Sequence, residues 1–155
     1  MPHIHDKIDF TSEVFIIFND KVLLRKHDKY KKWLSVGGHI ELDEDHNQAA
    51  IREVKEEVGL DVELFHEGHS PLLHNQDYKE LIPPQFSNRH KINDAHEHVT
   101  FVFFGKAKTD QLVLSETEKS DGCKWFSKEE LEDLQYGISE SIKIYARSAL
   151  EKVKN

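Results

Sequence analysis

The chain has 155 residues, of which 37% are apolar and 32% charged, and its 21 Lys and Arg against 29 Asp and Glu give a formal net charge of −8. This length and composition indicate one globular domain over residues 1–155, with a core of ordinary size. The acidic balance argues against general nucleic-acid binding, which needs a basic face. A small phosphate-bearing partner stays open, provided that a cation lies between protein and phosphate.

Cysteine content and hydropathy indicate the compartment. The single cysteine, Cys123, excludes an internal disulfide framework and fits a reducing environment. No stretch approaches the roughly 20 apolar residues that span a bilayer. Residues 1–7 lack the basic and then apolar segments of a signal peptide. We therefore expect a cytoplasmic protein without a membrane partner.

Predicted strands are interspersed with predicted helices along the chain. β-Branched and aromatic residues on both sides of the turn residues 19–21 predict a hairpin. Apolar residues at helical spacing predict a helix that Asp43 caps and Gly59 ends at the C′ position. Ser127 and Glu130 form a capping box for a second helix, so the whole indicates an α/β or α+β domain around a mixed sheet. The expected strands are 12–18, 22–25, 33–36, 61–65, 98–108 and 124–126, and the expected helices are about 45–58, 127–134 and 139 onward.

Residues 70–95 show no regular pattern. Three prolines, several Asn and Asp, and little periodicity predict a long loop. Structureless loops of this length in compact domains tend to be functional or disordered. A functional role is therefore the preferred interpretation, and the sequence leaves open whether the segment closes over a ligand or belongs to a dimer interface.

Three glutamates fall on one face of the predicted helix. Glu53, Glu56 and Glu57 are separated by three and four residues, which places their carboxylates one turn apart. Three like charges so placed repel one another, whereas a divalent cation converts that repulsion into coordination. Oxygen-only ligands favour a hard ion, Mg²⁺ first and Mn²⁺ second. The competing interpretation is a solvated acidic helix face.

A longer pattern contains these glutamates. Residues 38–60 read GHIELDEDHNQAAIREVKEEVGL. The segment resembles the Nudix box, the signature of the Nudix hydrolases. It meets every fixed position of that signature: Gly38, Glu44, Arg52-Glu53, the aliphatic Val54, Glu56-Glu57 and Gly59-Leu60.

The resemblance implies a Nudix-type α/β/α sandwich with a mixed β-sheet. It also implies a Mg²⁺-dependent pyrophosphohydrolase that cleaves a diphosphate linkage in a nucleoside diphosphate joined to another group, such as a nucleoside triphosphate or a nucleotide sugar. Mn²⁺ would serve as the alternative ion. A bound ion would screen the diphosphate charge and lower the pKa of a water.

Roles within the box follow from the resemblance, position by position. Glu53 and Glu57 would be the principal metal ligands, with Glu56 joining them and the Gly38 carbonyl as a further ligand. The other fixed residues have structural tasks: Glu44 shapes the loop, Gly59 ends the helix, and Arg52 orients a carboxylate, which its guanidinium can bind through two nitrogens.

Residues outside the box are expected to complete the site. The general base would be a box glutamate or Glu97, and for Glu97 the competing role is a strand-edge residue in solvent. His96 and His98 flank Glu97 and point to the opposite face if the strand extends that far. His98, Arg25, Lys26 and the group Arg89, His90 and Lys91 are candidates for phosphate binding, against the simpler role of solvated surface cations. Base stacking is open to Trp33, Tyr78 and Phe86, although for Trp33, as for Trp125, packing in the core is the preferred interpretation.

Two positions depart from the common family pattern, and two other functions stay open. Val36 replaces a frequent proline and Asp43 a frequent glycine, neither of which supplies a ligand. A non-catalytic nucleotide-sensing module is the alternative to an enzyme, but no box carboxylate is missing. Isoprenoid diphosphate isomerisation normally relies on a catalytic cysteine, and Cys123 lies far along the chain from the box. The oligomeric state, including a homodimer, is left open.

Overall fold

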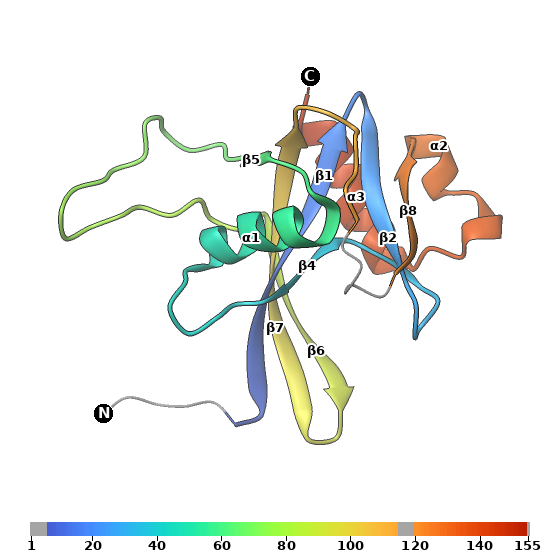
Figure 1. Cartoon of the computed structure of the whole chain (residues 1–155), viewed down its shortest axis with the longest axis horizontal. Coiled ribbons are helices and arrows are strands. Elements are labelled where there is room, and N and C mark those ends of the chain that lie inside the picture. The colour runs from blue at the N-terminus through green and yellow to red at the C-terminus, as the bar shows by residue number, and fades with distance from the viewer. Residues whose placement is uncertain (1–5, 115–119, 155) are drawn as a thin grey trace.

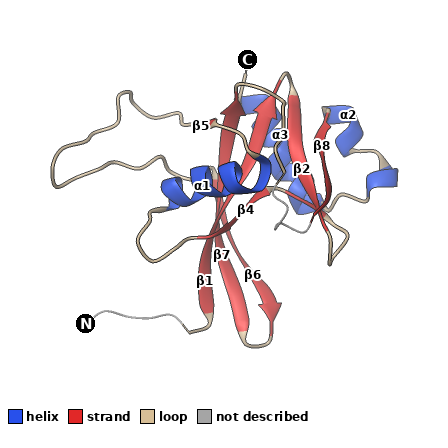
Figure 2. Ribbon diagram, in the orientation of Figure 1, coloured by secondary structure: helices blue, strands red, loops and turns tan. Residues whose placement is uncertain are grey.

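The computed structural model describes residues 6–114 and 120–154. Its strands form one mixed sheet with helices on both faces (Figures 1 and 2). None of the described helices has the length and apolar character needed to cross a membrane. The elements are β1 (Ile8–Phe18), β2 (Lys21–His27), β3 (Trp33–Leu34), β4 (Val36–His39), α1 (His46–Val58), β5 (Val62–Leu64), β6 (Phe86–Asn93), β7 (His96–Ala107), β8 (Ser120–Phe126), α2 (Lys128–Leu131), a 3-10 turn (Leu134–Tyr136) and α3 (Glu140–Lys152).

β1 is the central strand of the sheet. It pairs in parallel with β7 and antiparallel with β2 and β4, while β5 and β6 pair with β7, and β3 and β8 with β2. The predicted hairpin between β1 and β2 is confirmed, and both Asn19 and Asp20 adopt the positive φ that a two-residue type I′ turn requires. The mixed sheet is therefore built around a tight local hairpin and a long-range parallel pair.

Two apolar clusters lie on opposite faces of this sheet. Alternate residues of β1 face alternate sides, so Phe15 packs toward α3 while Val14 and Ile16 pack toward α1. Figure 1 shows α1 in front of the sheet and α3 behind it. The expected α/β/α sandwich is thereby confirmed. The α1 side uses Ala50, Val54 and Val58, and the α3 side uses Ile142, Ala146, Ala149 and Val153.

The N-terminus of α1 corrects one prediction. The N-cap is Asp45 rather than Asp43, and its side chain accepts a hydrogen bond of 2.9 Å from the Gln48 backbone N–H. The Gln48 side chain accepts in return from the Asp45 backbone N–H, also at 2.9 Å. This reciprocal cap needs an acceptor three residues after the N-cap, and Asp45 has Gln48 there whereas Asp43 has His46. The predicted C-terminus is confirmed, since Gly59 has a φ of 73°.

The predicted loop over residues 70–95 is wrong in its second half. Residues Phe86–Asn93 form β6, which pairs antiparallel with β7 and makes a hairpin that projects from the body of the domain (Figure 1). Most β6 side chains are exposed, so no apolar alternation marks the strand in the sequence. Backbone pairing with β7, rather than burial, therefore defines it. The predicted helix over 127–134 is also shorter, with a four-residue α2 after the confirmed Ser127–Glu130 capping box.

Glu13 is a half-buried carboxylate in the middle of β1. It lies on β1 between Gly37 of β4 and Val102 of β7, and its Oε2 accepts a hydrogen bond of 3.0 Å from Ser35 Oγ. Burial raises the pKa of Glu13 above its ordinary value, and the Ser35 hydrogen bond opposes that rise. A carboxyl whose pKa is raised by folding binds its proton more tightly in the folded state. The folded state therefore loses stability as the pH rises from the unfolded-state pKa through the folded-state pKa.

Glu13→Gln is accordingly expected to stabilise the chain at neutral and alkaline pH. Removing an unfavourable buried charge should gain about 0.5–2 kcal/mol, and each kcal/mol corresponds to about 2–4 °C in Tm at this chain length. Below the ordinary glutamate pKa of about 4.3 the two Tm values should converge, because both side chains are then neutral. Melts followed by circular dichroism across this range test the expectation, with the exposed Glu63→Gln as control. A lower Tm for Glu13→Gln at pH above neutral would contradict it.

Candidate functional site

The three glutamates of α1 differ in how far their side chains are exposed to solvent. The exposed fraction of the side chain is 2% for Glu57, 13% for Glu53 and 56% for Glu56. Their three- and four-residue spacing places them on neighbouring turns of the helix, as expected from the sequence. The helix thus presents one buried, one half-buried and one exposed carboxylate along a single edge.

Gly38 lets the Glu53 carboxylate lie directly against β4. A Cβ atom added at Gly38 would stand 2.5 Å from Glu53 Oε1 and 2.6 Å from its carboxyl carbon. Any side chain at this position would therefore displace the carboxylate. The contact brings the Glu53 oxygens close to the β4 backbone, where the resemblance to the Nudix box implies a further ligand from the Gly38 carbonyl.

Glu57 is held from two sides beneath this strand. Its Oε1 accepts a hydrogen bond of 3.2 Å from the Gly37 backbone N–H, and its Oε2 lies 2.8 Å from Arg25 Nε. The Arg25 side chain is only 12% exposed. Arg25, expected to bind a substrate phosphate, is therefore engaged with a glutamate of the box. The Nζ atom of the neighbouring Lys26 lies 5.8 Å from the centre of the Trp33 ring.

Arg52 connects the loop to the carboxylates. Its Nε and Nη2 bind the two carboxylate oxygens of Glu44 at 3.0 and 2.5 Å, which is the two-nitrogen contact expected from the sequence. Its Nη1 donates to Glu53 at 2.9 Å and to Glu56 at 3.1 Å. The Nη2 group also donates to the His39 carbonyl at 3.0 Å. Hydrogen bonding to Arg52 lowers the pKa of Glu44, and the same bond raises the pKa of Arg52.

The donor set fits a hard divalent cation. The carboxylates of Glu44, Glu53, Glu56 and Glu57 gather around the guanidinium groups of Arg25 and Arg52. All the side-chain donors are carboxylate oxygens, which suit Mg²⁺ and Mn²⁺. The structure thus brings together the expected ligand residues in a site whose donor chemistry suits such an ion.

Glu97 and Arg89 lie away from these carboxylates. On β1, Glu97 stands beside Ile8 whereas Gly38 stands beside Ser12, four residues farther along the strand. At ~3.3 Å per residue this separation is about 13 Å. Glu97 forms ion pairs with Arg89 and with Lys7, and the Arg89 hydrogen bond lowers its pKa. This placement does not support Glu97 as general base or Arg89 as a phosphate ligand beside the box.

His98 lies on the other face of the sheet from α1. Its side chain belongs to a group with Asp9, His39 and His96. This group lies on the same face of β1 and β7 that, farther along the two strands, packs against α3. The expectation that His96 and His98 point away from the face of Glu97 agrees with this arrangement. His98 is therefore not brought to the box glutamates.

The aromatic candidates for base stacking have different surroundings. Trp33 packs edge-on against Phe126 and Tyr136, with ring centres 5.0 and 6.3 Å apart, which confirms its expected place in the core. Phe86 packs against Tyr145 at 4.9 Å. Trp125 is partly buried against the α1-side cluster, as expected, whereas Tyr78 is exposed.

Cys123 lies closer to the site than its sequence position suggests. It stands opposite Arg25 in the antiparallel pairing of β2 with β8, and it packs against the α1-side cluster. Cross-strand neighbours of this kind have Cβ atoms about 4.5–5.5 Å apart. The separation of Cys123 from the box along the chain concealed this proximity, because only the strand register creates it.

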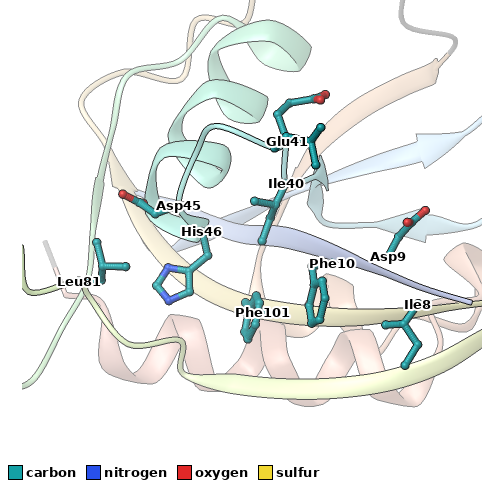
Figure 3. A pocket seen from close by; sticks show the side chains of 10 residues that line it. Ile8, Asp9, Phe10, Ile40, Glu41, Asp45, His46, Leu81 and Phe101 are labelled. Atoms are coloured by element: carbon teal, nitrogen blue, oxygen red, sulfur yellow. The ribbon is translucent and has the colours of Figure 1, made fainter. Parts of the chain in front are cut away.

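An open hollow of about 570 Å³ lies at the N-terminal end of α1, as Figure 3 shows. Its lining is mainly apolar, with Asp45 and His46 from the start of the helix. Glu53, Glu56 and Glu57 do not line it. The hollow therefore adjoins the box loop but is separate from the carboxylates. Its other lining residues are Ile8, Asp9, Phe10, Ile40, Glu41, Leu42, Leu81 and Phe101.

Comparisons with known proteins agree with this geometry. The family model of the NUDIX domain matches residues 11–147. The crystal structure of a hydrolase of the NUDIX family from Clostridium perfringens is 35% identical, with a TM-score of 0.80 over 92% of this chain and 96% of that one. A search of curated proteins finds no match.

Two less similar solved structures share the fold. The MutT NUDIX hydrolase from Burkholderia pseudomallei is 18% identical, with a TM-score of 0.65 over 96% of this chain and 99% of that one. A UDP-X diphosphatase is 16% identical, with a TM-score of 0.64 over 96% of this chain and 66% of that one. At such identities the likeness concerns the fold alone.

Proposed function

This chain belongs to the Nudix hydrolase family, and we propose that it is a Mg²⁺-dependent pyrophosphohydrolase, with Mn²⁺ as the alternative ion. Its substrate would be a nucleoside diphosphate linked to another group, such as a nucleoside triphosphate or a nucleotide sugar. The observation that carries the proposal is the Glu53 carboxylate lying against Gly38 beside the buried Glu57. This geometry supports the metal-ligand roles that the resemblance to the Nudix box implies for these residues.

The residues of the site would have separate roles in metal binding and in positioning the ligands. Glu53, Glu57 and the Gly38 carbonyl would hold the ion, and the exposed Glu56 would join them or face the substrate. Once bound, the ion would neutralise charge on the diphosphate and lower the pKa of the attacking water. Arg52 positions Glu53 and Glu56, and Arg25 positions Glu57. A general base from the box suits this geometry better than Glu97, which lies about 13 Å farther along the sheet.

A phosphate-release screen tests the proposal. The panel would contain nucleoside triphosphates, nucleotide sugars, dinucleoside polyphosphates and ADP-ribose, each with Mg²⁺, with Mn²⁺ and with EDTA. We expect hydrolysis of at least one compound with Mg²⁺, loss of that hydrolysis in EDTA, and its recovery when Mg²⁺ is restored. Tight binding of one compound without hydrolysis of any would favour the nucleotide-sensing alternative.

The role of Glu97 is tested separately by Glu97→Gln. Because Glu97 is ion-paired with Arg89 and Lys7 and lies far from the box carboxylates, we expect kcat to fall less than about tenfold. The acidic limb of the pH–rate profile should also keep its midpoint. A loss of at least about 100-fold together with the disappearance of that limb would instead identify Glu97 as the base.

A further inference from the structure

A second group of metal-ligating side chains lies on the sheet face away from α1. Asp9 of β1, His39 of β4, and His96 and His98 of β7 each offer one ligand atom, and these atoms all lie within 4.8 Å of one another. Asp9, His39 and the His96–His98 pair come from three distant segments of the chain, and they meet because β1, β4 and β7 lie side by side. None of them carries its side chain toward the box glutamates.

We propose that Asp9, His39, His96 and His98 form a binding site for Zn²⁺ or a similar transition-metal ion. Asp9 Oδ2 lies 3.1 Å from His96 Nε2 and 3.5 Å from His39 Nε2. Tetrahedral zinc with bonds of about 2.0–2.1 Å needs ligand atoms about 3.3–3.4 Å apart. Two edges of the required tetrahedron are therefore close to their final length, and His98 completes it by a small side-chain movement.

The chemistry of the donors separates this site from the carboxylate site. Three imidazoles and one carboxylate suit zinc, copper or nickel, whereas Mg²⁺ prefers oxygen ligands. Protonated imidazoles would repel one another here, because His39, His96 and His90 all lie around His98, with ring centres 5.0–5.5 Å from its own. Burial, and then these histidines, lower the pKa of His98, which favours the neutral form that binds metals. The central Asp9 carboxylate would repel a phosphate and thus favours a cation as the occupant.

The sheet holds the ligands ready and leaves them accessible. Asp9 stands beside His98 in the β1–β7 register, and Thr11 stands between His39 and Thr100. Thr11 and Thr100 join the same strands through a hydroxyl–hydroxyl hydrogen bond of 2.6 Å. Side-chain exposure of 48% for Asp9, 56% for His39 and 29% for His96 gives an ion direct entry from solvent.

The site is linked to the box through His39. The His39 side chain belongs to the histidine group, whereas its carbonyl accepts a hydrogen bond from Arg52 Nη2 at 3.0 Å, and Gly38 precedes it in the chain. An ion at this site would tie β4 to β1 and β7. It would therefore restrain the strand that places Gly38 against Glu53.

Zinc titration calorimetry of the full chain tests the site, with Mg²⁺ in excess so that the box carboxylates are already occupied. All proteins would carry His3→Asn and His5→Asn, because these two histidines lie outside the described residues and offer extra donors. We expect one Zn²⁺ per chain, a rise in Tm on binding, and a tetrahedral visible spectrum with Co²⁺. Loss of an outer-shell partner costs roughly 10–100-fold in metal affinity, so His96→Asn and Asp9→Asn, which remove direct ligands, should each weaken zinc binding at least about 100-fold.

Two controls make the result decisive. His74→Asn removes an exposed histidine elsewhere in the chain and should bind zinc as tightly as the parent protein. The double variant Glu53→Gln/Glu56→Gln should also retain the zinc site while losing the response to Mg²⁺. Zinc binding that disappears in this double variant but persists in His96→Asn would overturn the proposal. Absence of saturable zinc binding by a folded parent protein would overturn it as well, without bearing on pyrophosphohydrolase activity.

Discussion

Replacing Glu57 with glutamine is expected to lower kcat by at least about 1,000-fold at saturating Mg²⁺. Glu57 is the most buried of the three box glutamates, and it lies between the Gly37 backbone N–H and Arg25. Glutamine has almost the same shape and its carbonyl oxygen can still accept from Gly37. The substitution therefore removes the negative charge while keeping the packing. Steady-state hydrolysis of the best substrate from the phosphate-release screen measures the effect.

Two further measurements separate a lost ligand from a damaged fold. The Glu57→Gln chain should keep the circular dichroism spectrum of the native protein, and it should bind Mg²⁺ or Mn²⁺ more weakly. Glu63→Gln, at an exposed position of β5, is the matched control and should retain full activity. Equal turnover of Glu57→Gln and native chain in excess Mg²⁺ would show that Glu57 is not a metal ligand.

The sequence predicted those parts of the site that depend on local spacing. Helical periodicity places Glu53, Glu56 and Glu57 on one edge whatever surrounds the helix. The contact between Arg52 and Glu44 is likewise nearly local, because both residues belong to the box loop and its helix. Helix ends follow the same logic, and Asp43 was the wrong N-cap because Gln48, the reciprocal partner, stands three residues after Asp45.

Contacts created by strand register could not be predicted in this way. Arg25 reads as a surface cation at the end of a hairpin strand, and only the packing of α1 on β2 and β4 places it against Glu57. The β6 strand has too few buried residues to show a period of two, so its pairing with β7 left no pattern in the sequence. The Asp9, His39, His96 and His98 group combines three separate segments. Each histidine alone gave no sign of a ligand set.

The two arginines of the site, Arg52 and Arg25, have different structural roles. Arg52 is partly exposed and binds three carboxylates of the box, so it reduces their mutual repulsion at the surface. Arg25 is less exposed, at 12% of its side chain, and it pairs with the buried Glu57. A metal ion at the site would share Glu57 with Arg25. Stability without metal and metal binding should therefore both depend on the Arg25–Glu57 ion pair.

Arg25→Met provides the test of this dependence. Removing one partner of a buried ion pair costs about 3–5 kcal/mol because the other charge stays buried, which at about 2–4 °C per kcal/mol corresponds to a fall in Tm of about 6–20 °C. Methionine preserves much of the side-chain volume, so the loss should come mainly from the charge. Thermal unfolding in EDTA measures it. Lys26→Met, the adjacent position whose side chain lies over Trp33, is the matched control and should cost less than about 1 kcal/mol.

Mg²⁺ should narrow the difference between Arg25→Met and the native chain. The ion binds only the folded state, and in the variant it would also supply the positive charge that Glu57 has lost. The rise in Tm with Mg²⁺ is therefore expected to be larger for Arg25→Met than for the native chain or for Lys26→Met. An equal rise in all three proteins would mean that the ion does not contact Glu57. A smaller rise in Tm for Arg25→Met would show that Arg25 holds the metal ligands in place. This positioning effect would then outweigh the competition between Arg25 and the ion for the negative charge of Glu57.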